Sequence, residues 1–258
     1  MTKIKVIFED TELLVLDKPA AIVVNKSDTT RGETTLQDWV EKEFKIQNSE
    51  FRISKEIKGK DKYEEQAKLN FVSRAGIVHR LDKETSGIIL VAKKPSAFIN
   101  LQKQFKERKV KKTYLALAHG RIDPPEGEIN VEVGRLPWNR KRFGVLSGGR
   151  GAVTHYKVIK NLKLKIKNFQ EGLSLVELYP KTGRTHQIRV HLQYIKHPVF
   201  SDPLYAGRKT SKADRKLLPR IFLHASGISF YHPGTNKLMS FESPLPEDLQ
   251  NFLQQLSD

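Results

Sequence analysis

The sequence predicts an α+β fold in which a mostly antiparallel, mixed sheet is flanked by helices. Short β-like runs follow one another closely near the N-terminus, and strands outnumber helices along the rest of the chain. No regular alternation of strand and helix occurs, which argues against a parallel α/β sheet. The 258 residues contain no repeat and no low-complexity linker, so we expect one domain spanning residues 1–258.

Strands are predicted where short β-branched and aromatic runs are bounded by turn residues. Near the N-terminus these runs are separated by only a few residues, which favours antiparallel pairing. The predicted strands are residues 4–9, 13–17, 21–25, 88–92, 113–118, 128–133, 153–159, 164–167, 173–179, 221–224, 228–231 and 238–242.

Helices are predicted where apolar residues recur every three or four positions. One is expected after Thr35, which is a suitable N-cap, and another begins at Pro95. Further helices are expected over residues 185–195 and after Pro246. Residues 45–70 are polar and charged, and we expect a long excursion there that is helical in part.

The charge balance points to a polyanionic partner. Lys and Arg number 46 against 29 Asp and Glu, which gives a net charge of +17. Eight basic residues lie within residues 93–112 with one acid, and five lie within residues 134–150 with none. Trp138 and Phe143 interleave with the second group, a pattern typical of RNA-binding surfaces. A generally basic, solvated surface is the plainer alternative.

Several classes of protein are excluded by what the sequence lacks. It has no cysteine, so disulfides, thiolate catalysis and cysteine-ligated zinc are impossible. No apolar run approaches the roughly 20 residues that cross a bilayer. The first ten residues contain no apolar signal region. We therefore expect a cytoplasmic protein, with a monomer as the default state.

The most informative segment is residues 79–87, His-Arg-Leu-Asp-Lys-Glu-Thr-Ser-Gly, between a polar loop and a predicted buried strand. Taken alone, Asp82 beside Arg80 reads as well as a surface ion pair or a turn cap. The segment, however, resembles the signature of RluA-type pseudouridine synthases. The resemblance continues in the same order through residues 17–19, 111–114, 182–191, 197–198, 202–205, 223–225 and 232–233.

The resemblance implies a pseudouridine synthase catalytic fold with a central RNA-binding cleft. Many members of the family also carry an N-terminal S4 domain, whereas this sequence begins almost directly with the catalytic motifs, so we expect a single catalytic domain without an S4 domain. It implies an isomerase that converts uridine to pseudouridine in structured RNA, with 23S rRNA as the expected substrate and tRNA as the alternative. The family's nucleophilic aspartate corresponds to Asp82, its KxY tyrosine to Tyr114 and its HQIR arginine to Arg189. By the same resemblance, the residues expected to bind RNA or substrate are His79, Arg80, Leu81, Thr85, Arg184, His186, Gln187, Ile188 and Leu223.

The residue types suit this chemistry. Moving the uracil from an N1 to a C5 linkage involves no net oxidation, so no cofactor is expected. A carboxylate can form a covalent adduct or support a route through a glycal, and the sequence leaves both open. A fixed cation, Arg189, would keep a desolvated Asp82 ionised. Tyr114 offers a flat ring and a phenolic oxygen for proton transfer.

Other functions fit less well. The histidines of the matching segments have no metal-ligand spacing, so no metal is expected. A glycosidase needs two carboxylates flanking the bond, and only Asp82 has a suitable setting. A non-catalytic RNA-binding protein would also explain the basic clusters. The family pattern is broken at Ala21 and Ser201, which stand where glycine is common.

Overall fold

The computed structural model describes residues 4–27, 30, 32–44, 62–164 and 172–257. The chain divides into two compact units, the first formed by Met1–Val110 and Ile228–Ser243, the second by Lys111–Gly227 and Pro244–Asp258. Strand β9 (Leu223–Tyr231) begins in the second unit and ends in the first. Within the described ranges, no helix is long and apolar enough to span a membrane.

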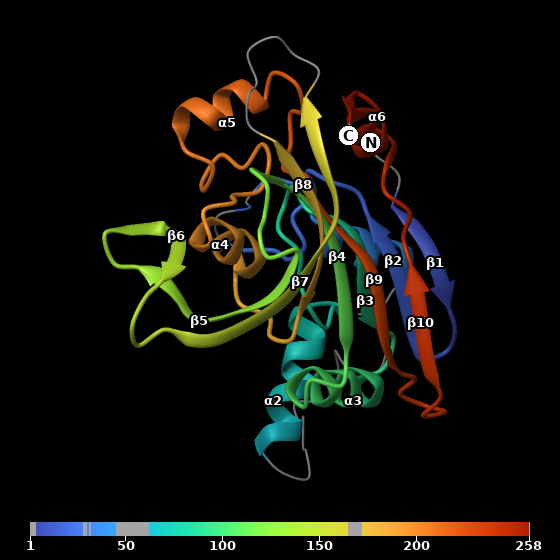
Figure 1. Ribbon diagram of the computed structural model, residues 1–258. Helices are drawn as coiled ribbons and strands as arrows, with labels where there is room; N and C mark the ends of the chain where they lie inside the picture. The colour runs from blue at the N-terminus through green and yellow to red at the C-terminus, as the bar shows by residue number, and fades with distance from the viewer. Residues whose placement is uncertain (1–3, 28–29, 31, 45–61, 165–171, 258) are drawn as a thin grey trace. The chain divides into compact units, whose positions relative to one another are not determined.

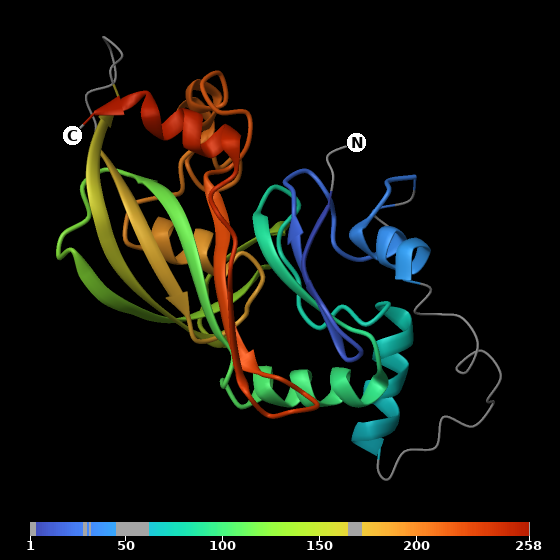
Figure 2. The same cartoon turned by 90° about the vertical axis from the view of Figure 1, so that its right-hand side faces the viewer.

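The first unit is built on three antiparallel strands. Strand β2 pairs with β1 on one side and with β3 on the other, and its apolar residues are almost fully buried. Strand β10 pairs with β9, and helices α2 and α3 pack against each other (Figures 1 and 2). The elements are β1 (Lys5–Glu9), β2 (Leu13–Lys18), α1 (Leu36–Phe44), α2 (Lys62–Ser73), β3 (Ser86–Ala92), α3 (Pro95–Lys106) and β10 (Leu238–Glu242).

The sequence explains where the helices of this unit begin and end. Helix α1 starts with a capping box, in which Asp38 N–H donates to Thr35 Oγ1 at 3.2 Å and Thr35 N–H donates to Asp38 Oδ2 at 2.8 Å. Helix α2 is followed by Gly76, whose positive φ of 74° suits glycine. A Cβ on Gly76 would lie 2.0 Å from Ala92 O, so only glycine lets the chain pass so close to β3.

The second unit contains five antiparallel strands in the order β4-β8-β7-β5-β6, with β11 added beside β7. Helix α4 packs against strands β5 to β8, and the β5–β6 hairpin extends beyond the other strands (Figure 1). The elements are β4 (Lys111–His119), β5 (Glu126–Leu136), β6 (Asn139–Val145), β7 (Arg150–Leu164), β8 (Leu173–Pro180), α4 (Gln187–Tyr194), α5 (Arg208–Asp214), α6 (Glu247–Gln254) and β11 (Leu256–Ser257).

Side chains of successive β4 residues pack into two separate apolar clusters of the second unit. Ala116 and Ala118 pack with Ile188 and Leu192 of α4, whereas Leu117 packs with a separate cluster that includes Phe252 of α6. This follows from the alternation of side chains along a strand. Helices α4 and α6 therefore cover opposite faces of β4, and α4 is held firmly against its face.

The predicted α+β class with a mostly antiparallel sheet is confirmed, as are most of the predicted elements. The prediction of a strand over residues 21–25 is wrong. Instead of pairing with another strand, Val23 O and Val24 O accept the N–H groups of Leu36 and Gln37 at the start of α1. Residues 221–224 and 228–231 were predicted as two strands, yet Leu223 to Tyr231 form one.

Three elements were not predicted, namely β6, α5 and β11. The strands predicted at 153–159 and 164–167 meet in β7, which ends at Leu164, and the rest of the second strand lies outside the described residues. Of the excursion predicted over 45–70, residues 62–70 are helical in α2, and residues 45–61 lie outside the described ranges.

Candidate active site

Asp82 lies in a loop of the first unit that is anchored on both sides. On one side, His79 Nε2 accepts the Leu90 N–H of β3 at 3.0 Å, which requires this nitrogen to carry no proton. On the other side, Asp82 O accepts the Thr85 N–H at 3.1 Å, one residue before β3 begins. Leu81 is only 4% exposed, so it anchors the loop in the interior. The half-buried Asp82 is thus held on a rigid support.

Lys18 is a supporting residue that lies in the matching segment 17–19 but was assigned no role from the sequence. Its side chain is fully buried, and Nζ donates to Pro19 O at 2.9 Å, Ile22 O at 3.0 Å and Lys83 O at 3.3 Å. A buried ammonium is tolerated only when such acceptors replace water. Because Lys83 follows Asp82 directly, Lys18 ties the loop to the end of β2. The sequence signal is its position, because it is a lysine at the end of a largely apolar strand and within a segment shared with the family.

The remaining predicted residues of this loop differ in exposure. The Arg80 side chain is exposed and has no hydrogen bond or ion pair within the described part of the chain. Lys83 is exposed too, and it pairs with Glu33 at 2.9 Å. Thr85 is 2% exposed, and its Oγ1 lacks a hydrogen-bond partner among the described residues. Of these residues, Arg80 is the exposed one whose side chain forms no ion pair within the described ranges.

In the second unit, the segment before α4 is organised by Gln187. Its Oε1 accepts from Thr182 Oγ1 at 2.7 Å and from Arg184 N–H at 2.9 Å. Its Nε2 donates to Val153 O and to Thr154 Oγ1, each at 3.0 Å. The side-chain amide therefore binds within the protein and fixes the loop against β7. Contact between Gln187 and RNA stays a prediction.

Arg189 projects from α4 and pairs with Asp202. Nε donates to Oδ2 at 2.7 Å and Nη2 to Oδ1 at 3.0 Å, and both side chains are buried. Its guanidinium carbon also lies 5.0 Å from the ring centroid of Tyr205. Asp202 Oδ1 in turn accepts the N–H groups of Leu204 and Tyr205. Such a two-point pair fixes the plane of the guanidinium.

Tyr205 connects Arg189 to the β5–β6 hairpin. Its hydroxyl lies 2.9 Å from His186 Nδ1 and accepts the Phe143 N–H at 3.1 Å. The Arg142 guanidinium carbon lies 5.3 Å from the Tyr205 ring centroid. His186 has a positive φ of 56° and sits at the N-cap of α4. These contacts hold the hairpin, the helix and Arg189 as one local structure.

Tyr114 and Lys112 lie close together on β4. Tyr114 is half-buried, is paired with Leu178 of β8 and packs against the apolar cluster that contains Ile188. Lys112 Nζ donates to Thr182 O at 2.9 Å, and burial lowers the pKa of Lys112 to about 8. Ile188 and Leu223 are buried in the same cluster, so the structure places both predicted binding residues in the core. Lys112 was missed as a support for the Thr182 loop.

The described residues contain no group of three or more His, Cys, Asp or Glu side chains that could hold a metal ion. Among the histidines, His191 is fully buried, and neither ring nitrogen has a hydrogen-bond partner in the described ranges. Burial lowers the pKa of His191 to about 4, so its ring is neutral at pH 7. His191 is therefore a core residue of α4.

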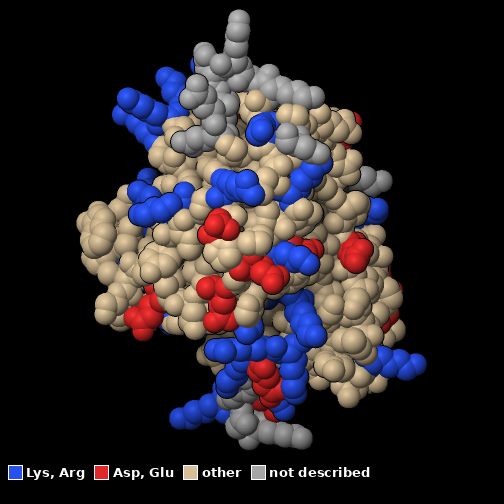
Figure 3. All heavy atoms as spheres, viewed as in Figure 1, with Lys and Arg blue, Asp and Glu red and all other residues tan. Residues whose placement is uncertain are grey.

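The two basic groups found in the sequence differ in the structure. In the first, Lys93, Lys94 and Lys109 pair with acids, at 2.7, 2.6 and 2.7 Å. Figure 3 likewise shows acidic side chains among the Lys and Arg over α2 and α3. In the second, none of the five basic side chains of residues 134–150 pairs with an acid in the described structure. Residues 134–150 therefore form the cationic surface that is less neutralised by neighbouring acids.

A family model described as RNA pseudouridylate synthase matches residues 12–194. Ribosomal large subunit pseudouridine synthase D of Nitrosomonas europaea is 36% identical over 97% of this chain and 64% of its own length. An uncharacterised RNA pseudouridine synthase of Bacillus subtilis is 36% identical over 96% of this chain and 71% of its own. A second ribosomal relative, from Neisseria meningitidis, is matched over 60% of its length, so the chain spans less than two thirds of these two ribosomal relatives.

Solved structures support the same fold. Human RNA pseudouridylate synthase domain containing 1 has a TM-score of 0.70 and 24% identity, over 99% of this chain and 88% of its own. Human RNA pseudouridylate synthase domain containing 4 has a TM-score of 0.66 and 22% identity. Because the family model covers most of the chain and relatives 36% identical match nearly all of it, the chain belongs to the RNA pseudouridylate synthase family.

Proposed function

We propose that this protein isomerises uridine to pseudouridine in RNA, with ribosomal RNA as the first candidate substrate and tRNA as the alternative. The observation that carries the proposal is Asp82, a half-buried carboxylate in the family's signature loop, with that loop anchored to β3 and to Lys18. Family membership supports the reaction. The names of the Nitrosomonas and Neisseria relatives support ribosomal RNA.

In this proposal Asp82, Tyr114 and Arg189 act on one target nucleotide. Asp82 is the nucleophile. The N1–C1′ bond breaks, a C5–C1′ bond forms, the C5 hydrogen leaves as a proton and N1 gains a proton, so there is no net oxidation and no redox cofactor is required. Arg189, whose guanidinium is fixed by Asp202, is the proposed cationic group of the reaction. Tyr114 contributes a ring surface and a phenolic oxygen from a rigid strand.

The target uridine must leave its base stack before it can react. Extrusion costs a few kcal/mol, so loops and bulges are easier substrates than regular duplex. Arg80 is suited to occupy the vacated space, because its planar side chain is exposed while the neighbouring Leu81 is anchored. We further propose that the protein works as a monomer in the cytoplasm.

The test is release of tritium from RNA labelled at uridine C5, since the isomerisation must displace that hydrogen. Ribosomal RNA and tRNA prepared from cells that lack the protein serve as separate substrates. The proposal predicts release from one of the two preparations at a rate that scales with protein concentration. No release from either preparation would favour a second candidate, a non-catalytic RNA-binding protein, which the unpaired basic residues of 134–150 also support.

A further inference from the structure

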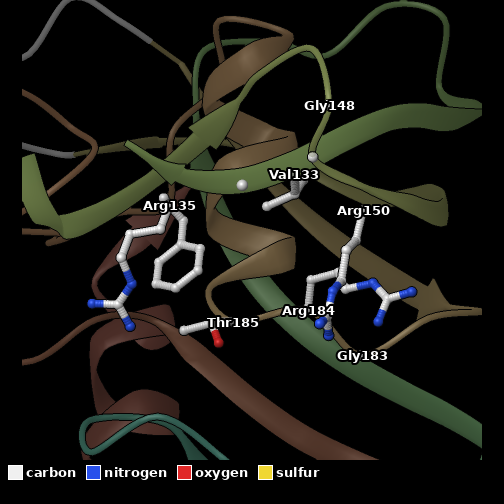
Figure 4. A pocket seen from close by; sticks show the side chains of 10 residues that line it. Val133, Arg135, Gly148, Arg150, Gly183, Arg184 and Thr185 are labelled. Atoms are coloured by element: carbon white, nitrogen blue, oxygen red, sulfur yellow. The ribbon is translucent and has the colours of Figure 1, made fainter. Parts of the chain in front are cut away.

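A pocket of about 320 Å³ lies within the second unit, lined by the β5–β6 hairpin, the β6–β7 turn and the segment before α4. This volume is at the lower end of the roughly 300–1,000 Å³ typical of small-molecule sites, so it suits one nucleotide and not a duplex. Its cationic lining consists of Arg135, Arg150 and Arg184. Figure 4 shows Arg135 on one side of the pocket and Arg150 and Arg184 on the other.

The positive charge of the pocket lining favours the binding of an anion. No acidic residue lines it, so the three guanidinium groups repel one another in a concave space. Arg184 Nε donates to Gly151 O at 3.3 Å, which orients that side chain. The Arg150 side chain is exposed and forms no hydrogen bond or ion pair within the described ranges. Glu132 is not a lining residue, and its carboxylate is engaged by the N–H of Gly148, which is one, at 2.8 Å.

The opposite side of the pocket offers a flat surface. The Arg135 guanidinium carbon lies 4.9 Å from the ring centroid of Phe143, and Nη1 donates to Arg140 O at 2.6 Å. The Arg135 side chain is exposed, so the guanidinium plane is held in place with one face accessible. Nucleobases stack on aromatic rings and on guanidinium planes of this kind.

We propose that this pocket binds one nucleotide of single-stranded RNA other than the target uridine, with its phosphate on Arg150 and Arg184 and its base on the Arg135–Phe143 stack. The bound nucleotide differs from the target because Asp82, Tyr114 and Arg189 are not among the lining residues. The inference deepens the proposed function by naming a subsite for the flanking RNA. It rests on that function only for the identity of the ligand as RNA.

The phosphate contact is tested by the salt dependence of binding to a fluorescein-labelled oligouridylate of about eight nucleotides, between about 50 and 200 mM KCl. The slope of log K against log salt is negative, and Arg150→Gln should make it less negative by about 0.7, the value for one single-strand phosphate. The matched control is Arg121→Gln, an exposed residue outside the lining. An unchanged slope in Arg150→Gln, or an equal change in Arg121→Gln, overturns the phosphate assignment.

The base contact is tested by Arg135→Lys, which keeps the charge but removes the plane. The slope should stay as in the wild-type protein, while binding weakens on the order of tenfold at every salt concentration. Wild-type affinity in this variant would overturn the stacking assignment. Because Arg135 and Arg150 are exposed, thermal melting should show that both variants fold like the wild-type protein.

These measurements test the proposed subsite independently of the proposed isomerisation. Oligouridylate binding needs no isomerisation, so the slope can change even if the protein releases no tritium from any RNA. In the tritium assay, Arg150→Gln should raise KM while kcat stays within about twofold of wild type, the pattern of lost uniform binding. If kcat falls and KM is unchanged, the pocket holds the reacting nucleotide, and the inference of a separate subsite is wrong.

Discussion

Arg189 and Asp202 form a two-point pair within the second unit, with Nε to Oδ2 at 2.7 Å and Nη2 to Oδ1 at 3.0 Å. Both side chains are buried, so the pair is shielded from solvent and salt. A guanidinium has five N–H donors, and Asp202 engages two of them. Asp202 therefore sets the orientation of Arg189, although the family motifs predicted a role only for the arginine.

Asp202→Asn should damage both stability and activity. The variant leaves the Arg189 charge buried without a carboxylate, and removing one partner of a buried pair costs about 3–5 kcal/mol. Urea unfolding gives the stability, and tritium release gives the activity, which should fall by on the order of tenfold or more because Arg189 loses its orientation. A variant with wild-type unfolding and turnover would show that Asp202 does not position Arg189.

Lys18→Met should destabilise the Asp82 loop. The change leaves the carbonyls of Pro19, Ile22 and Lys83 without their buried donor, at an expected cost of at least about 2 kcal/mol. Lys83→Met is the matched control, because that side chain is exposed and pairs only at the surface. Equal unfolding midpoints for the two variants would contradict the anchoring role of Lys18.

Because His191 is buried and neutral, we expect the free energy of unfolding of the protein to fall in acid. Burial lowers its folded pKa to about 4 from 6.5, so the unfolded chain binds more protons between these values. Stability is therefore lost as pH falls from about 6.5 to 4, by up to about 3 kcal/mol. In His191→Leu the decrease measured by urea unfolding should be smaller by about that amount. An identical decrease in both proteins would show that His191 does not contribute.

Hydrophobic pattern and turn residues predicted the fold class and most elements, but they could not identify pairing made outside the local sequence. Residues 21–25 have strand-like composition, yet the carbonyls of Val23 and Val24 bind the first N–H groups of α1. The β6 strand lies in a polar hairpin with little apolar alternation, so its composition gave no signal. Strand β9 reads as two because Ala225 to Gly227 interrupt its apolar pattern.

The sequence was more informative about the site. The motifs assigned candidate roles to Asp82, Tyr114 and Arg189, which stay predictions, whereas the supporting roles of Lys18 and Asp202 became evident only through their contacts. No sequence pattern distinguished Lys93, Lys94 and Lys109, which pair with acids, from the basic residues of 134–150, which do not. Pairing depends on residues far away in the chain, such as Glu9 with Lys93.

The departures from the family pattern at Ala21 and Ser201 have a clear conformation. Both residues have a positive φ, 68° for Ala21 and 64° for Ser201, a conformation that is less favourable for them than for glycine. Ala21 is exposed, and Ala21→Gly should raise the free energy of unfolding by about 0.5–1 kcal/mol. Ser201→Gly should bring no such gain, because Ser201 Oγ donates to Leu218 O at 2.5 Å. Destabilisation by Ala21→Gly in urea unfolding would contradict this backbone argument.

The role of Asp82 is tested most directly by Asp82→Asn, assayed for tritium release from C5-labelled RNA and for RNA binding in the same preparation. The side chain keeps its size but loses its nucleophilic carboxylate. Asp123→Asn, a change at an exposed carboxylate, is the control. We predict that Asp82→Asn abolishes release and leaves RNA affinity within about twofold of wild type. Release at the wild-type rate by Asp82→Asn would contradict the account.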